Sequence, residues 1–172
     1  MAVNVYDVSN CFINLAQQEK NSLTKLQMQK LLYYAQGFNL ALYDKPIFDD
    51  DIQAWSYGPV VLKIHFAYKK FNSEPLTILD GLESNCLSPG TIKLIRSVLH
   101  QYGSYDGWDL VHMTHNEAPW ANAYQPGINA IIPLDSLKDY FRGRIGVVRK
   151  LPIEYHLEES FRQYGELYDL LA

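Results

Sequence analysis

Two histidines and a glutamate lie close together in the chain and are the first residues to consider for chemistry. His112 and His115 are three positions apart, and Glu117 follows two positions later. Imidazoles at i and i+3 of a helix can share one face, and imidazole and carboxylate are both zinc ligands. A zinc site needs three or four protein ligands, however, and the histidines at positions 65, 100 and 156 form no second pair. We therefore predict no metal site, and a structural hydrogen bond at a helix end is the alternative role for His115.

Other catalytic arrangements find no support in the sequence. Cys11 lies in a stretch with helical spacing, Cys86 lies in a polar stretch, and no serine occupies a G-x-S-x-G motif. The 10 glycines form neither G-x-G-x-x-G nor a Walker loop. The acidic run at positions 49–51 lacks the spacing of an EF-hand loop and is typical of a solvated turn. The sequence predicts a protein that is not an enzyme and that needs no cofactor.

Positive charge is concentrated in one stretch near the end of the chain. Its basic residues are Lys138, Arg142, Arg144, Arg149 and Lys150, and Asp139 is the one acid among them. The net charge of the whole chain is −4, which argues against binding nucleic acid by overall attraction to phosphates. A solvated surface is the simpler interpretation of this stretch, and a surface for nucleic acid or an acidic partner is the alternative.

Length and composition indicate one folded domain. The chain has 172 residues, of which 48% are hydrophobic and 20% charged, and this is ordinary globular composition. Two distant cysteines suggest neither a disulfide framework nor a cysteine zinc site. There is no basic segment followed by an apolar run at the start, and no apolar segment approaches the roughly 20 residues needed to span a bilayer. The cytoplasm is the expected compartment, with no membrane partner.

Helical signals cover most of the sequence. Asn4 is expected to cap a first helix, and Thr24 and Gln27 match the capping box that starts a second helix. That second helix has an apolar stripe, and its Lys25, Gln29 and Gln36 are expected to face water. Further helices are expected from Pro59, over 89–102 between Ser88 and Gly103, over 106–114, after Pro119, and over 134–142.

Three short segments are expected to be extended. Residues 47–48 and 52–55 predict a small β-hairpin, and residues 128–132 predict a strand. The fold class is therefore mainly α: a multi-helix domain with a small β-hairpin and short strands. We assign residues 1–146 to this domain. Residues 147–172 are assigned to a C-terminal amphipathic helix that packs on it and offers a route to a homodimer; its apolar stripe is Leu157, Phe161, Tyr164, Tyr168 and Leu171.

Three motifs, in a fixed order, carry a resemblance to a known family. They are LQMQKLLYYAQG at positions 26–37, AWSYGPVV at 54–61 and MTHNEAPW at 113–120. Together they resemble the Panacea domain, also called SocA-like or GepA-like, which is carried by prophages and bacterial mobile elements. Met113 stands where leucine is more common in the family, and this departure conserves volume.

The resemblance implies an antitoxin. Members of the family neutralise a cognate toxin by direct binding, and the SocA member acts as a proteolytic adaptor that delivers its toxin to the ClpXP protease, an AAA+ protease. The alternative is a standalone phage or mobile-element protein that inhibits or recruits a host factor. A third class, a hydrolase or metal enzyme using His115 and Glu117, predicts stoichiometric metal in the purified protein.

Aromatic residues in the three motifs are the candidates for partner binding. Large aromatic side chains supply much of the contact energy at protein interfaces, although most of these are expected to form a shared core. The candidate partner-binding residues are Tyr33, Trp55, Tyr57, His115 and Trp120, of which Tyr57 and Trp120 are the strongest candidates to border a groove for a toxin segment.

Overall fold

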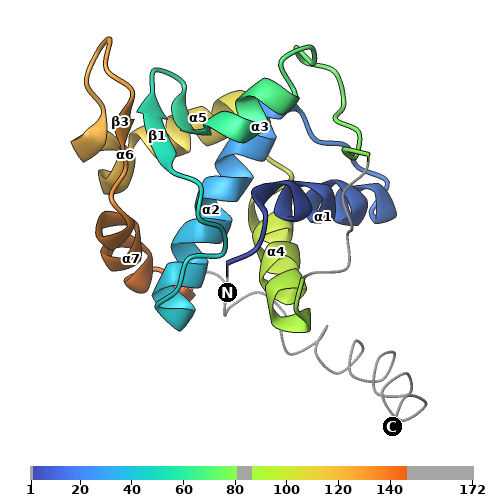
Figure 1. Ribbon diagram of the computed structural model, residues 1–172, viewed down its shortest axis with the longest axis horizontal. Helices are drawn as coiled ribbons and strands as arrows, with labels where there is room; N and C mark the ends of the chain where they lie inside the picture. Colours follow the sequence, from blue (N-terminus) through green and yellow to red (C-terminus); the bar gives the residue numbers. More distant parts are fainter. Residues whose placement is uncertain (1, 81–86, 147–172) are drawn as a thin grey trace, which may run out of the picture.

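The computed structural model describes residues 2–80 and 87–146, and this part of the chain contains seven helices and three short strands (Figure 1). The fold is mainly α with a small sheet, as the sequence predicts. In chain order the elements are α1 (Val5–Gln18), α2 (Lys25–Tyr43), β1 (Ile52–Trp55), β2 (Gly58–Val61), α3 (Leu62–Ala67), α4 (Pro89–Tyr102), α5 (Gly107–His115), α6 (Ala118–Ala123), β3 (Ala130–Ile131) and α7 (Leu134–Arg142). The expected C-terminal helix lies outside the described residues.

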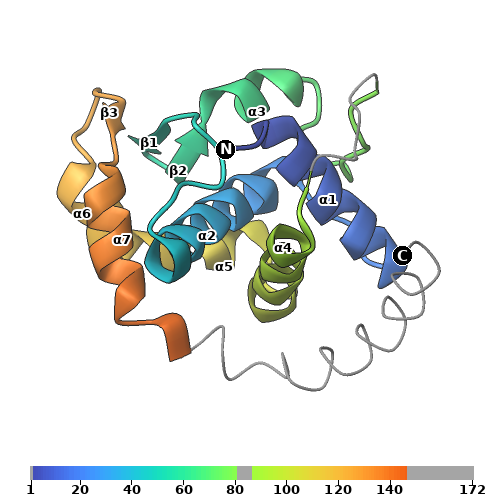
Figure 2. The same cartoon turned by 60° about the horizontal axis from the view of Figure 1, so that its bottom comes forward.

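Helix α2 is the centre of the molecule. It contacts α1, α3, α4, α5, α7 and β2, and Figure 2 shows it enclosed between α7 on one side and α1 and α4 on the other. Every residue from Met28 to Phe38 is buried. The apolar stripe is buried as predicted, but the expectation that Gln29 and Gln36 face water is wrong. An amphipathic pattern identifies one buried face of a helix, and α2 is surrounded on all sides.

The buried side-chain amides of Gln29 and Gln36 in α2 hold two neighbouring segments by forming the hydrogen bonds that a peptide group would form. The side chain of Gln29 donates to the carbonyl of Val61 over 3.1 Å and accepts from the Val61 amide over 2.7 Å. Gln36 in the same way donates to the Phe48 carbonyl and accepts from the Ile47 amide, each over 2.8 Å. A side-chain amide offers one acceptor and two donors, so it satisfies backbone groups that would be costly to bury alone.

Helix starts agree with the predicted capping residues. Asn4 accepts from the Tyr6 amide at the start of α1, and Ser88 accepts from the Thr91 amide at the start of α4. At α2, the Thr24 hydroxyl accepts from the Gln27 amide, and the Gln27 side chain accepts from the Thr24 amide. This reciprocal capping box is confirmed in both of its hydrogen bonds.

The sheet has the order β2-β1-β3, and here two predictions are wrong. Strand β1 pairs with β2, not with residues 47–48, and Phe48 makes only an isolated bridge to Val3. Pro59 lies inside β2, opposite Ala54, so the helix expected to begin there is confined to α3. Proline is tolerated in β2 because β2 is an edge strand of the sheet.

Glycine makes the tight turn between β1 and β2 possible. Gly58 has a φ of +93°, a backbone conformation that residues with a Cβ rarely adopt. The turn therefore closes over Ser56 and Tyr57 alone, and Trp55 and Gly58 face each other at its base. Among the described helices, none combines the length and the apolar run needed to cross a bilayer.

Candidate functional site

The carboxylate of Glu117 is held by two adjacent tyrosines of α2. The hydroxyl of Tyr33 donates to one carboxylate oxygen over 2.8 Å, and that of Tyr34 donates to the other over 2.9 Å. Burial raises the pKa of Glu117 to about 7, against the opposing effect of the two hydroxyls. Burial and the nearby Glu117 charge raise the pKa of both tyrosines. The three side chains join α2 to the connection between α5 and α6.

Aromatic packing fixes these tyrosines in place. Tyr34 stacks on Tyr102 of α4, with ring centroids 3.8 Å apart and planes 4° apart. Tyr33 meets the edge of Phe141 of α7, with centroids 5.5 Å apart. The Phe141 ring lies directly over Gly37, where a Cβ would overlap it. Both tyrosines are completely buried, and their hydroxyls position Glu117 and the loop that carries it.

Trp120 and His115 pack beneath the β1–β2 turn. The indole N–H of Trp120 donates to the carbonyl of Trp55 over 2.8 Å. His115 stacks on one face of the Trp120 ring, 4.0 Å between centroids, and Tyr124 stacks on the other face at 4.5 Å. Burial lowers the pKa of His115, which favours the neutral imidazole. Trp120 is 8% exposed, so it acts mainly as a support for Trp55 and the turn.

Lys30 is buried below the same turn. Its side chain is fully buried, and its Nζ donates to the Pro59 carbonyl over 3.1 Å. Burial lowers the pKa of Lys30 to about 7. A Cβ added at Gly58 would lie 2.6 Å from Lys30 Cε and 2.8 Å from Thr114 Oγ1. The turn therefore depends on glycine for space as well as for its backbone conformation.

Tyr57, at the tip of the turn, projects into solvent and pairs with Trp108 in the first turn of α5. Their rings meet edge to face at 5.2 Å, and they are 59% and 54% exposed. On the other side of the turn, half-buried Trp55 packs against His65 at 4.9 Å, and His65 meets the 62% exposed Phe66. We call Trp55, Tyr57, Phe66 and Trp108 the aromatic face.

The start of α2 joins the two sides of this face. Leu26 packs against Gly107, the residue before Trp108, so closely that a Cβ at Gly107 would lie 2.9 Å from Leu26 Cδ2. The preceding residue, Lys25, lies near enough to His65 for its charge to lower the pKa of that histidine, in addition to the larger effect of burial. The β1–β2 turn, α3 and α5 lie at the top of Figure 1, beside α2, which contacts β2, α3 and α5.

The predicted partner-binding residues therefore divide by exposure. Tyr57 is exposed, Trp55 and His115 are half-buried, and Tyr33 and Trp120 are buried. Trp55, Tyr57, His115 and Trp120 come together around the turn, whereas Tyr33 lies with Glu117. Trp108 and Phe66 were not among the partner-binding residues predicted from the sequence. For Trp108 the spacing gave no signal of exposure, because Val111, three positions later, lies on the same side of the helix.

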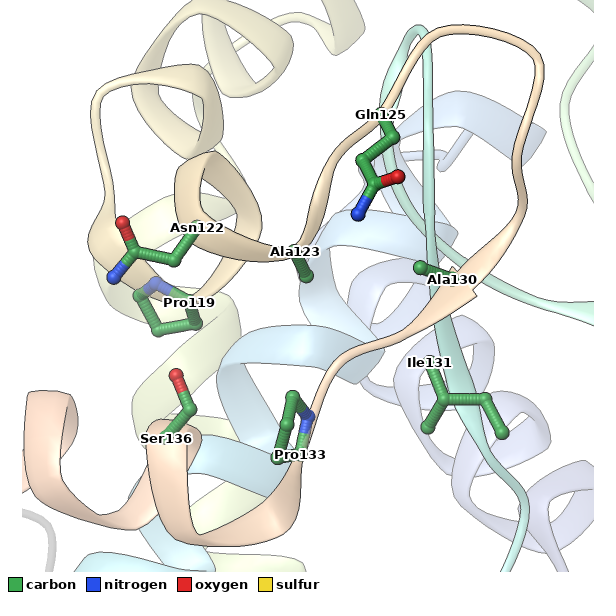
Figure 3. A pocket seen from close by; sticks show the side chains of 8 residues that line it. All are labelled: Pro119, Asn122, Ala123, Gln125, Ala130, Ile131, Pro133 and Ser136. Atoms are coloured by element: carbon green, nitrogen blue, oxygen red, sulfur yellow. The ribbon is translucent and has the colours of Figure 1, made fainter.

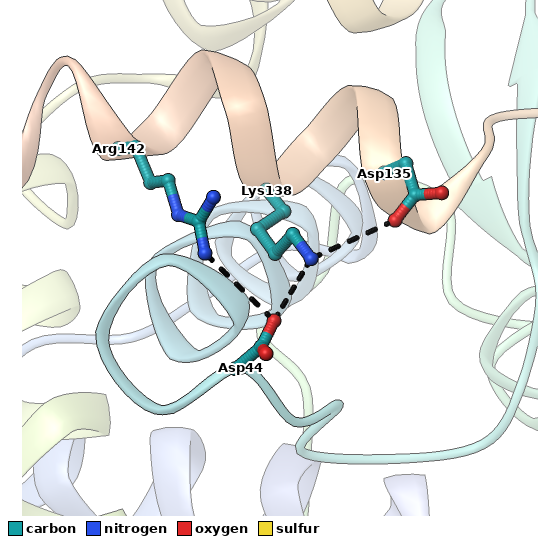
Figure 4. A network of polar contacts seen from close by, with 4 residues as sticks. All are labelled: Asp44, Asp135, Lys138 and Arg142. Atoms are coloured by element: carbon teal, nitrogen blue, oxygen red, sulfur yellow. Dashed lines mark hydrogen bonds and ion pairs between the residues drawn. The ribbon is translucent and has the colours of Figure 1, made fainter.

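The predicted basic stretch is partly neutralised by ion pairs at the end of α2. Asp44 receives Lys138 Nζ at 2.9 Å and Arg142 at 3.9 Å, and Asp135 lies 3.8 Å from Lys138 (Figure 4). Arg144 stacks on Tyr140, 3.6 Å from its ring centroid. Arg149 and Lys150 lie outside the described residues. The described part of this stretch therefore joins α7 to α2 and offers little unpaired charge to a nucleic acid.

A separate hollow of about 380 Å³ lies between α6 and the segment from β3 to α7 (Figure 3). Its lining residues are mostly apolar, with three neutral polar side chains: Pro119, Asn122, Ala123, Gln125, Ala130, Ile131, Pro133 and Ser136. None of these side chains is a titratable acid, base or nucleophilic thiol, so the hollow offers no acid–base pair. Across residues 2–80 and 87–146, no three His, Cys, Asp or Glu side chains are grouped so as to hold a metal ion.

Comparison with known proteins gives one match. The family model described as antitoxin SocA-like, Panacea domain, matches residues 28–121. This range runs from the first turn of α2 to α6 and includes Lys30, Tyr33, Tyr34, the β1–β2 turn, Glu117 and Trp120. Searches of curated proteins and of solved structures returned no match.

Proposed function

Since the chain belongs to the family of SocA-like antitoxins with a Panacea domain, we propose that it neutralises a small cognate toxin by binding it directly. The observation that carries this proposal is the aromatic face. Tyr57 and Trp108, which pack against each other, and Phe66, which packs against His65, are each more than half exposed. Exposed aromatic residues on a rigid base are typical of binding hot spots, since little conformational entropy is lost when they are covered.

The supports below the turn explain how this face keeps its shape. Lys30, Gln29 and Trp120 each hydrogen-bond to a backbone group of residues 55–61. Tyr57 is thus presented on a turn tied down from below, while the turn itself is only two residues long. A preorganised surface of this kind binds more tightly than a mobile loop carrying the same side chains.

Growth rescue tests the proposal. The small protein encoded next to the gene for this chain is expressed in a host whose growth it arrests, together with the wild-type chain or a variant. We expect the wild type to restore growth and Tyr57→Ala/Trp108→Ala to fail, since loss of two hot-spot aromatics weakens binding by about 2 kcal/mol or more. Tyr43→Ala is the matched control, because Tyr43 is 56% exposed but lies at the far end of α2.

The same assay separates direct binding from the adaptor mechanism. Direct neutralisation predicts rescue in a host that lacks ClpXP, whereas an adaptor requires the protease. Full rescue by the double aromatic variant, with its folding verified by circular dichroism, would contradict the assignment of binding to the aromatic face. If no neighbouring protein arrests growth and affinity capture returns a host factor instead, the mobile-element interaction protein becomes the better assignment.

A further inference from the structure

We infer that the aromatic face takes a toxin segment in which a carboxylate stands beside an apolar side chain, and that Lys25 and Lys69 bind this carboxylate. The inference rests on the proposed function and adds the chemistry of the partner. It follows from the placement of two cations, a helix start and the aromatic side chains on one surface.

Lys25 and Lys69 supply positive charge on the α3 side of the aromatic face. Lys69 lies in the turn that ends α3, where its amide donates to the Phe66 carbonyl over 3.2 Å, and Lys25 is the first residue of α2, which contacts α3. The charges of both lysines lower the pKa of His65, which packs between Trp55 and Phe66. Neither ammonium group has a carboxylate within ion-pair distance among the described residues, whereas Lys63 pairs with Asp50 at 2.7 Å. In a chain with a net charge of −4, two uncompensated lysines at one edge of an aromatic surface favour an anionic partner.

The start of α2 adds the positive end of a helix dipole to the charge of the two lysines. Lys25 is the first residue of α2, and its first turn contains no acidic residue, although negative charge is the favoured type at a helix start. The capping box satisfies the amides of Thr24 and Gln27, but those of Lys25 and Leu26 have no acceptor among residues 2–80 and 87–146. A carboxylate placed here meets free N–H groups and the lysines together.

The apolar part of the surface lies immediately beside these groups. Leu26 follows Lys25 and touches Gly107, so Trp108 is adjacent to the start of α2. On the α5 side of Trp108 the charge is reversed, because Asp106 caps α5 and Asp109 lies in its first turn. The surface is therefore polarised, and it selects one orientation: the partner's carboxylate toward α3 and its apolar side chain over Leu26 and Trp108.

A peptide library provides the test with a defined probe. Random twelve-residue peptides displayed on phage are selected on the wild-type chain after removal of those that also bind Tyr57→Ala/Trp108→Ala. We expect the remaining peptides to be enriched in Asp or Glu near a Leu or an aromatic residue. Their affinity should fall at least tenfold on Lys25→Glu/Lys69→Glu and should recover when the acidic residue of the peptide is changed to Lys.

The control has the same change in charge at two exposed lysines of other elements, Lys45→Glu/Lys93→Glu, and should retain the affinity. Glutamate at position 25 is compatible with folding, since acidic residues stabilise a helix start. Peptides without acidic enrichment, or an equal loss of affinity in the control, overturn the inference. So does a selection that yields no peptide dependent on Tyr57 and Trp108. Growth rescue by the aromatic variants tests the proposed function separately, so each can fail alone.

Discussion

The side-chain nitrogen of Lys30 lies 3.1 Å from the carbonyl oxygen of Pro59, and this hydrogen bond joins α2 to the strand that follows the β1–β2 turn. Lys30 is fully buried, and no carboxylate among the described residues pairs with it. An unpaired charge in such a place is costly, and the neutral amine is the form that burial favours.

Lys30 should make the protein more stable in mildly alkaline solution. Its pKa is about 7 in the folded chain and near the usual 10.5 when unfolded, so between these values the unfolded chain binds more protons. The free energy of unfolding should therefore rise from pH 7.5 to 9.5, by up to about 1.4 kcal/mol per pH unit. Urea denaturation should show that this rise is smaller in Lys30→Met and unchanged in Lys93→Met, whose lysine is exposed. Equal slopes in all three proteins would show that Lys30 is not desolvated.

Glu117 should have the opposite effect at lower pH. Its pKa is raised to about 7 from the usual 4.5, so between these values the folded chain binds more protons than the unfolded chain. The free energy of unfolding should fall as the pH rises from 5 to 7. This fall in the free energy of unfolding should be absent in Glu117→Gln. It should remain in Glu19→Gln, since Glu19 lies at the exposed end of α1. If the free energy of unfolding of Glu117→Gln depends on pH as that of the wild type does, Glu117 does not have a raised pKa in the folded chain.

Two glycines with positive φ allow strain and crowding to be measured separately. Gly58 has a φ of +93° and close neighbours, whereas Gly127 has a φ of +75° and no atom within 4 Å of an added Cβ. Gly127→Ala should cost only backbone strain, about 1 kcal/mol, and Gly58→Ala should cost a further 1–3 kcal/mol from overpacking against Lys30 and Thr114. Thermal denaturation of both variants provides the comparison. A Gly58→Ala cost no larger than that of Gly127→Ala would contradict the close packing under the turn.

Helices were predictable because their signals are local. The capping box at Thr24 and Gln27 and the range of α7 follow from neighbouring residues, and both agree with the structure. The partner of β1 was predicted wrongly, since a helix was expected from Pro59 and residues 47–48 were the extended segment nearest to residues 52–55. The choice depends on Gln29 and Gln36, which hold these two segments from a distant helix. The prediction that those glutamines face water failed for the same reason.

The candidate site was predictable only in part. Tyr57 was identified from its motif, and the structure places it at an exposed position. Trp108 lies outside the three motifs, and its pairing with Tyr57 bridges 51 positions of the sequence through the fold of α5. The ion pairs of Asp44 with Lys138 and Arg142 bridge 94 and 98 positions, so these two cations of the predicted basic stretch are paired in space.

The hydrogen bonds that Gln29 and Gln36 of α2 form with backbone groups have a consequence for hydrogen exchange. The amides of Ile47 and Val61 lie outside the helices, yet each is buried and donates to a side chain on α2 over 2.8 Å and 2.7 Å. These amides can exchange with solvent only when their segments leave α2, so their protection should match that of the core of the helix. Slow-exchanging amides in these two non-helical segments would thus report on global unfolding, and not on loop motion.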